Sequence, residues 1–181
     1  MPNKTALVTG ASEGIGAEFI QILAARGYDL ILVARSEDKL NRLAAKAETE
    51  FNIKCKVIVA DLSQSKAAHN LFQRVHELSL DVNFLVNNAG LLKNGFFTEL
   101  SLEEQEKMIA VNVIALTSLT HLFANYMASK DGGYILNVAS LAGWMAIPNQ
   151  NVYAATKAYV LAFTQALSNE MIAADSGVKI T

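Results

Sequence analysis

The chain has 181 residues, of which 52% are hydrophobic and 18% charged, and this composition predicts one compact domain with a substantial core. A formal net charge of −2 gives no electrostatic reason to expect a nucleic acid or an anionic membrane as partner. A single cysteine, Cys55, excludes an intrachain disulfide, and we expect no metal site. Its neighbours Lys54 and Lys56 could lower its pKa, but the alternating apolar pattern favours a structural thiol.

Apolar runs alternate with helical patterns along the whole chain. We expect strands at residues 6–8, 30–33, 57–60, 84–86, 134–138 and 178–181. We expect helices at about 16–26, 37–51, 64–78, 102–128 and 151–174. Short, continuously apolar strands separated by helices are typical of a parallel sheet covered on both faces. The predicted fold class is α/β, a doubly wound parallel sheet in three α/β/α layers.

One segment, residues 108–129, carries no charged side chain and is long enough to span a bilayer. It contains polar side chains that disfavour the bilayer core: Asn112, Thr117, Ser118, Thr120, His121 and Asn125. We therefore expect no membrane partner, but a helix buried against the sheet or shared with a second subunit, in a homodimer or homotetramer. The first expected strand begins close to Met1 with no apolar signal segment before it, which favours a cytoplasmic location.

The stretch from Thr9 to Gly16 lies between an apolar run and a helical pattern. A glycine-rich turn there presents backbone N–H groups and a helix N-terminus to an anion. Its candidate cofactor contacts are Gly10, Ser12, Glu13, Gly14, Ile15 and Gly16. The same residues fit the Gly-x-Ser-x-Gly nucleophile elbow of a serine hydrolase, with Ser12 as nucleophile. A glycine-rich turn that binds nothing is a third reading.

Polar or small residues also follow the second to fifth expected strands, at the edge where ligands of open α/β sheets bind. Arg35 stands nineteen residues after Gly16, where an NAD site would have an acid, and a guanidinium there suits a ribose 2′-phosphate. Asp61, followed by Leu62, either accepts from an adenine amino group or caps a helix entered at Ser63. The segment Asn88-Ala89-Gly90 is either an approach to a nicotinamide or a plain turn.

Tyr153 and Lys157 share one helix face because they are four residues apart. Tyr126 and Lys130 have the same spacing, but Tyr153 opens its helix and has Ser140 thirteen residues before it, at a strand end. A nearby ammonium favours a phenolate, which can exchange a proton with a substrate hydroxyl while hydride moves to or from a cofactor. Ser140 can polarise the substrate oxygen.

Taken in order, Thr9-Gly10-x-x-x-Gly14-x-Gly16, Asn87-Asn88-Ala89-Gly90, Asn112, Ser140 and Tyr153-x-x-x-Lys157 resemble the short-chain dehydrogenase/reductase family over the whole chain. The resemblance implies a Rossmann dinucleotide-binding domain over residues 1–181 and a catalytic tetrad of Asn112, Ser140, Tyr153 and Lys157. It implies that Tyr153 and Lys157 also contact the cofactor, with Lys157 on the nicotinamide ribose. It implies further that Arg35 favours NADP(H), with NAD(H) possible. Glu13 departs from members with a second basic residue in the glycine loop.

These patterns predict an NADP(H)-dependent oxidoreductase that interconverts an alcohol and a ketone or aldehyde, with Ser140 and Tyr153 contacting the substrate. Two alternatives stay open: a non-catalytic nucleotide-binding module, and more remotely the serine hydrolase. The apolar stretch 141–148 after Ser140 either lines a substrate pocket or packs on a neighbouring subunit. Because family members continue beyond the sixth strand, we expect the domain to be C-terminally incomplete at Thr181.

Overall fold

Six parallel strands form the centre of the protein, whose computed structural model describes residues 4–181, so residues 1–3 of the expected domain lie outside it. The strands are β1 (Thr5–Thr9), β2 (Asp29–Ala34), β3 (Cys55–Val59), β4 (Val82–Asn87), β5 (Gly133–Asn137) and β6 (Val178–Ile180). They lie in the order β3-β2-β1-β4-β5-β6, so the winding reverses between β1 and β4. The predicted doubly wound parallel sheet is confirmed.

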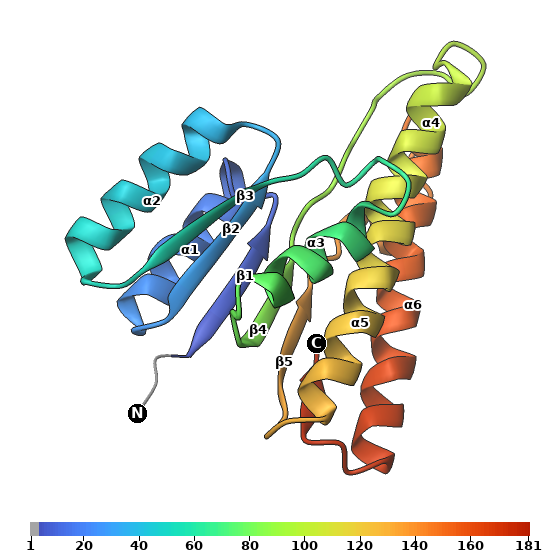
Figure 1. Ribbon diagram of the computed structural model, residues 1–181. Helices are drawn as coiled ribbons and strands as arrows, with labels where there is room; N and C mark the ends of the chain where they lie inside the picture. Colours follow the sequence, from blue (N-terminus) through green and yellow to red (C-terminus); the bar gives the residue numbers. More distant parts are fainter. Residues whose placement is uncertain (1–3) are drawn as a thin grey trace.

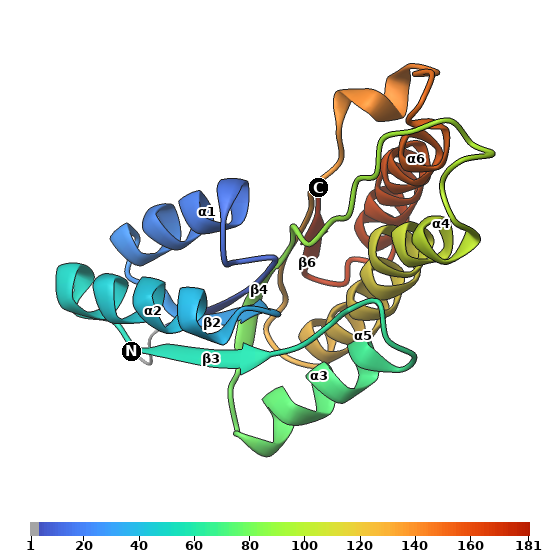
Figure 2. The ribbon, with the colours of Figure 1, turned by 90° about the horizontal axis from the view of Figure 1, so that it is seen from above.

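Helices connect the strands and cover the sheet. They are α1 (Gly14–Ala25), α2 (Glu37–Phe51), α3 (Ala67–Glu77), α4 (Leu102–Ile109), η1 (Ala110–Ala115), α5 (Leu116–Ala128), η2 (Leu141–Trp144) and α6 (Asn151–Ala173). Figures 1 and 2 show α1 and α2 on one side of the sheet, and α3, α5 and α6 on the other. Right-handed crossovers require this division, because the chain moves outward in opposite directions from the central pair of strands.

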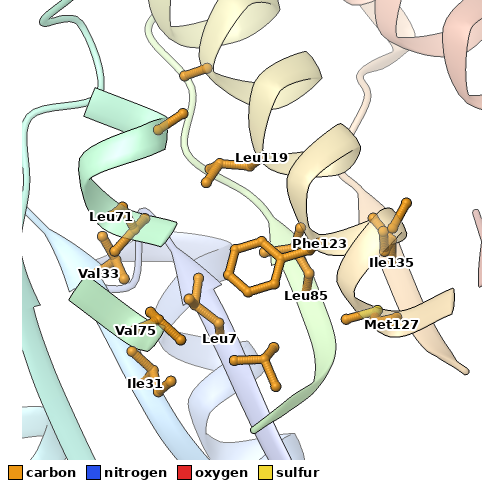
Figure 3. Close-up of a cluster of buried hydrophobic side chains, with 14 of the residues drawn as sticks. Leu7, Ile31, Val33, Leu71, Val75, Leu85, Leu119, Phe123, Met127 and Ile135 are labelled. Carbon is orange, nitrogen blue, oxygen red and sulfur yellow. The ribbon is translucent and has the colours of Figure 1, made fainter. Parts of the chain in front are cut away.

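Alternating strand residues divide the core into two layers. Leu7 of β1 and Leu85 of β4 point toward α3 and α5, where they pack in one cluster with Phe123 (Figure 3). Ala6 and Val8 of β1 belong to the second cluster, under α1 and α2. Each fully buried large apolar side chain contributes about 1.5–3 kcal/mol, so both layers hold the strand ends in fixed relative positions.

Two local features differ from the sequence prediction. The third helix begins at Ala67 rather than at residue 64, because Asp61 organises a turn and Lys66 adopts a left-handed conformation with φ of 61°. The short 3₁₀ helix η2 directly after Ser140 was not predicted. The Ser140 hydroxyl oxygen accepts from the Ala142 N–H at 3.2 Å and so caps this helix. A single serine in the sequence is not enough to predict such a cap.

The expected helix 102–128 is continuous, but η1 in its middle is π-helical. By length and composition it is the one described helix that could cross a membrane, with a mean hydropathy of 1.5 over 18 residues. Within the protein 44% of that window is buried, and core helices pass the same test, so the feature is weak evidence for a span. π-Helical turns are frequent at functional sites, and Asn112 lies in this one.

Candidate active site

The glycine turn between β1 and α1 is closely packed against the loop that follows β4. A Cβ on Gly16 would lie 2.1 Å from the carbonyl oxygen of Gly10, and one on Gly10 would lie 2.8 Å from the Ala89 Cα. Gly10 also has a φ of +64°, in the region that favours glycine. The turn therefore depends on glycine at both positions, because any side chain there would collide with neighbouring backbone atoms.

Thr9 and Asn88 join the glycine turn to the β4 loop. The Thr9 hydroxyl accepts from the N–H groups of Asn88 and Ala89 at 3.1 and 3.0 Å and donates to the Val86 carbonyl oxygen at 3.2 Å. The Asn88 amide donates to the carbonyl oxygens of Thr9 and Gly10 at 3.0 and 3.1 Å. The sequence motif includes Thr9 but does not predict this bridging role. Its signal was a polar residue closing an apolar strand.

A groove of about 500 Å³ crosses the carboxyl ends of the central strands. It is lined by ten of the predicted cofactor contacts: Gly10, Ser12, Glu13, Ile15, Arg35, Asp61, Leu62, Asn88, Ala89 and Gly90. Gly14 and Gly16 belong to the turn without lining the groove, and the other two predicted contacts, Tyr153 and Lys157, do not line it either. A larger groove of about 890 Å³ runs along edge strand β3 between α2 and α3, away from the glycine turn and the predicted catalytic residues.

Charged side chains gather where Arg35 follows β2. Arg35 is exposed, and Lys39 on the first turn of α2 lines the same part of the groove. The Lys39 ammonium lies 2.6 Å from a carboxylate oxygen of Glu13, at the start of α1. Glu13 is therefore paired with a cation that the sequence analysis did not single out. The ion pair, and to a lesser degree Arg35, holds the pKa of Glu13 below its usual value.

Asp61 caps a turn and also lines the groove. Its carboxylate accepts from the Ser63 N–H at 3.0 Å and from the Ser63 hydroxyl at 2.8 Å. These hydrogen bonds, with the Ser63 N–H first, lower the pKa of Asp61. Both predicted roles are thus compatible at one position, although the capped segment is a turn and helix α3 starts only at Ala67.

Asn112 clamps the β4 loop to α6. Its amide oxygen accepts from the Leu91 N–H at 2.8 Å, and its amide nitrogen donates to the Leu91 carbonyl at 2.9 Å and to the Thr156 hydroxyl at 3.0 Å. A buried asparagine with these partners fixes the backbone next to Gly90. Thr156 is a supporting residue that the sequence analysis missed, because nothing marked it apart from its neighbour Lys157.

Lys157 lies buried beside the groove. Its ammonium donates to the Val138 carbonyl oxygen at 2.7 Å and lies 5.9 Å from the centre of the Tyr153 ring. A Cβ on Gly90 would stand 3.7 Å from this ammonium and 3.6 Å from the Asn112 amide oxygen, so the end of the groove reaches two members of the predicted tetrad here. Burial lowers the pKa of Lys157.

Ser140 and Tyr153 are held near Lys157 by adjoining elements. Ser140 begins η2, two residues beyond Val138, and η2 packs closely on α6, where a Cβ on Gly143 would lie 2.8 Å from the Lys157 backbone. Tyr153 is half-buried, in the first turn of α6. The structure thus brings β5, η2 and α6 together around one predicted set of side chains.

The second Tyr-x-x-x-Lys pair has similar geometry in a different environment. The Lys130 ammonium lies 5.7 Å from the Tyr126 ring centre, but the Tyr126 hydroxyl donates to the Asp81 carboxylate at 2.6 Å. Burial and the Asp81 carboxylate raise the pKa of Tyr126 to about 12. Tyr126 is thus tied up as a donor next to the start of β4, at the opposite sheet edge from the groove.

The hydrolase reading finds no support around Ser12. No histidine between residues 4 and 181 lines the groove that Ser12 lines. His121 faces Asn125, and the His76 ring stacks on Phe72. The groove instead suits a dinucleotide. It runs from Arg35 past the glycine turn, where no side chain blocks an approach to the backbone, toward Gly90, which lies beside the buried Lys157 ammonium.

Comparisons with known proteins agree with this geometry. A family model described as short chain dehydrogenase matches residues 4–181. A very-long-chain 3-oxoacyl-CoA reductase of Phaeosphaeria nodorum is 37% identical over 171 residues, covering 92% of this chain and 50% of the relative. The chain thus spans about half the length of this curated relative.

Two solved structures superpose closely. The bulky-bulky ketone specific alcohol dehydrogenase of Comamonas testosteroni is 32% identical with a TM-score of 0.93, covering 100% of this chain and 71% of the other. A short-chain dehydrogenase of Sphingobium yanoikuyae, solved in complex with NADPH, is 35% identical with a TM-score of 0.91, covering 98% of this chain and 68% of the other.

Proposed function

Because the chain belongs to the short-chain dehydrogenase family, we propose that it is an NADP(H)-dependent oxidoreductase that interconverts an alcohol and a ketone or aldehyde. The single observation that carries the proposal is the buried Lys157 ammonium, fixed by the Val138 carbonyl next to Tyr153 at the end of the groove. The nicotinamide cofactor supplies or accepts the hydride when bound.

Tyr153 is the proposed general acid and base. In the reductive direction its phenol gives a proton to the substrate oxygen, and in the oxidative direction the phenolate takes the hydroxyl proton. The Lys157 ammonium stabilises the phenolate electrostatically and also offers hydrogen bonds to a nicotinamide ribose. The Ser140 hydroxyl keeps its proton free to donate to the substrate oxygen, because its oxygen accepts from Ala142.

Asn112 acts through the backbone in this proposal. Its side-chain hydrogen bonds hold Leu91 and Thr156, so it fixes the loop next to Gly90 and the helix turn that carries Lys157. We therefore assign Asn112 a positioning role in addition to the catalytic role that the family resemblance implies. Lys157 itself would be held from two sides, by Val138 and by its own helix.

Arg35 supports NADP(H) as the preferred cofactor. It lines the groove at the end of β2, where its fork of donors suits a 2′-phosphate. The Sphingobium yanoikuyae structure, which is in complex with NADPH, provides a parallel from a similar protein.

We propose that the substrate is a bulky, apolar carbonyl compound. Directly after Ser140, the side chains of Leu141, Trp144 and Met145 are 79%, 70% and 56% exposed, an unusual apolar surface beside a polar site. The names of two similar proteins mention a very-long-chain 3-oxoacyl-CoA and bulky-bulky ketones. These three side chains would line the substrate side of the site.

A panel of carbonyl compounds tests the function. The full-length protein is assayed by oxidation of NADPH and, separately, of NADH with ketones that increase in apolar bulk, from acetone to aryl ketones and a 3-oxoacyl thioester. We expect turnover to rise with bulk and to be faster with NADPH. Nucleotide binding without turnover of any carbonyl compound would favour the non-catalytic module.

We also propose a homodimer or homotetramer in the cytoplasm, without a membrane or nucleic-acid partner. The helix Leu102–Ala128 exposes Ile109 and Ile114, which are 41% and 60% exposed, and Tyr159 of α6 is 38% exposed. Covering these apolar side chains in a second subunit would remove them from water. Analytical ultracentrifugation without detergent tests this: a monomer would contradict it.

A further inference from the structure

An ion pair spans the rim of the groove between the glycine turn and α2. Glu13 occupies the N-cap position of α1, directly before Gly14, without a side-chain capping hydrogen bond. Its carboxylate lies 2.6 Å from the ammonium of Lys39 in the first turn of α2. Both side chains line the groove, and they are 74% and 47% exposed. Exposed ion pairs contribute little to stability, so this one can rearrange at low cost.

Arg35 lies on the same rim. It lines the groove together with the pair, and its charge reaches the Glu13 carboxylate, because it adds to the effect of Lys39 in lowering the pKa of Glu13. Three of the charged side chains that line the groove are cations (Arg35, Lys39 and Lys107) and two are carboxylates (Glu13 and Asp61), which leaves a net positive charge. The glycine turn contributes only the acid, and the second cation comes from α2.

We propose that Lys39 is the second cation of a ribose 2′-phosphate site, and that Glu13 holds Lys39 at the rim while weakening the attraction for the phosphate. The inference rests on the proposed NADP(H) function and specifies which residues set the cofactor preference. Arg35 binds the phosphate through its donor fork, and Lys39 acts as a mobile point charge opposite it. Glu13 competes with the phosphate for Lys39 and also repels it.

Binding of two small probes separates the 2′-phosphate from the rest of the cofactor. Isothermal titration calorimetry compares adenosine 2′,5′-bisphosphate with 5′-AMP on the full-length protein, so no catalytic turnover is needed. The variants are Lys39→Met, Glu13→Gln and the double variant. Lys46→Met is the matched control, because Lys46 is an exposed lysine of the same helix that does not line the groove.

Each variant has a distinct expected effect. Lys39→Met should lower the affinity for the bisphosphate about five-fold and leave the affinity for 5′-AMP within about two-fold of the wild-type value. This is the loss expected for one partly screened charge contact. Glu13→Gln should raise the affinity for the bisphosphate about two- to five-fold, because it removes the repulsion between Glu13 and the phosphate and frees Lys39. Lys46→Met should change the affinity for neither probe by more than about two-fold.

The double variant decides whether Lys39 touches the phosphate or only neutralises Glu13. Under direct contact, adding Lys39→Met to Glu13→Gln weakens the bisphosphate at least about five-fold, since no carboxylate is left to neutralise. If the double variant binds the bisphosphate as tightly as Glu13→Gln alone, Lys39 acts only by masking Glu13 and the proposed contact is wrong. An unchanged affinity in Lys39→Met would overturn it as well.

The wild-type protein separates failure of this inference from failure of the proposed function. Equal affinity for the two probes would show that no 2′-phosphate site exists, which contradicts both. A clear preference for the bisphosphate that survives Lys39→Met but is lost in Arg35→Ala would keep the NADP(H) function and reject the role of Lys39.

Discussion

The ammonium of Lys157 donates to the carbonyl oxygen of Val138 at 2.7 Å, and this bond ties α6 to the backbone directly after β5. This bond fixes the position of Lys157 relative to the edge of the sheet. Because the groove lies on the same edge, the lysine, the Tyr153 ring and Gly90 keep fixed relative positions.

Replacing Tyr153 with phenylalanine should abolish turnover and preserve nucleotide binding. The change removes the only proposed proton donor, and general acid–base catalysis contributes about 10²- to 10⁴-fold to rates. We expect kcat to fall by at least about 100-fold, while the Kd for NADPH, measured by fluorescence titration, stays within about three-fold.

Tyr126→Phe is the matched control for Tyr153→Phe, because Tyr126 has a lysine at the same distance range but its hydroxyl is bound to Asp81. Its kcat should stay within about three-fold of the wild-type value, and only stability should drop, by about 1–2 kcal/mol for a charge-assisted hydrogen bond. Similar turnover in the two variants would remove Tyr153 from the mechanism.

Arg35→Ala should discriminate between the two nicotinamide cofactors. Loss of a charge-assisted, bidentate contact is worth about 1.5–3 kcal/mol, so the Kd for NADPH should rise about 10- to 100-fold and that for NADH by less than about three-fold. Arg42→Ala provides the control, because Arg42 is an exposed arginine of the following helix, α2, that does not line the groove. Equal losses for both cofactors would contradict the assignment of Arg35 to a 2′-phosphate.

Asn112→Ala should lower stability as well as activity. It leaves the Leu91 N–H and carbonyl without the partners that now hold them at 2.8 and 2.9 Å, and unsatisfied groups cost about 1–3 kcal/mol. Urea denaturation should show a loss in this range. Asn125→Ala is the control, because Asn125 is exposed on the same continuous helix. It should lower the unfolding free energy by less than about 0.5 kcal/mol. Equal costs would argue against the clamp.

Gly16→Ala should disrupt the glycine turn. The added Cβ would meet the Gly10 carbonyl oxygen at 2.1 Å, which backbone atoms relieve only by moving. We expect a loss of about 3 kcal/mol in unfolding free energy and weak nucleotide binding. In Gly14→Ala the Cβ meets nothing within 4 Å, and only the left-handed backbone costs about 1–2 kcal/mol. The prediction is refuted if Gly16→Ala is the milder change.

Cys55 should resist alkylation in the folded protein. Burial, followed by the Glu48 and Asp29 carboxylates, raises the pKa of its thiol from 9.0 to about 12, and the thiolate is the reactive form. Iodoacetamide at pH 8 should therefore modify Cys55 at least about ten times more slowly than it modifies the urea-unfolded chain.

The same shift makes stability depend on pH. Because the folded state keeps the thiol proton longer than the unfolded chain, stability is lost as pH rises from about 9 toward 12. The unfolding free energy should fall more steeply in that range for the wild type than for Cys55→Ser. Parallel curves, or equal alkylation of folded and unfolded protein, would show that the thiol is not perturbed.

The sheet and most of the site could be predicted because they depend on local patterns. Apolar runs locate strands, and in a parallel sheet the residues after each strand share one edge. Arg35, Asp61 and Asn88 were therefore placed on one groove without knowledge of any contact. The spacing of Tyr153 and Lys157 likewise put both on one helix face.

The remaining features depend on how elements approach one another. Lys39 meets Glu13 only because α1 and α2 pack side by side, and nothing near either residue encodes that contact. The Asn112 amide binds Leu91, twenty-one residues away, and no local pattern predicts that contact. The start of α3 depended on the left-handed Lys66, a conformation that lysine rarely adopts.

The glycine turn separates what cannot vary from what can be exchanged. Gly10 and Gly16 define the path of the main chain by excluding side chains, so evolution has no small step available at either position. Glu13, Arg35 and Lys39 project from that path onto an exposed rim, where substitutions leave the backbone untouched. If the proposed cofactor preference holds, a designer could therefore retune this scaffold toward NAD(H) or further toward NADP(H) by editing three surface positions and leaving the glycine turn intact.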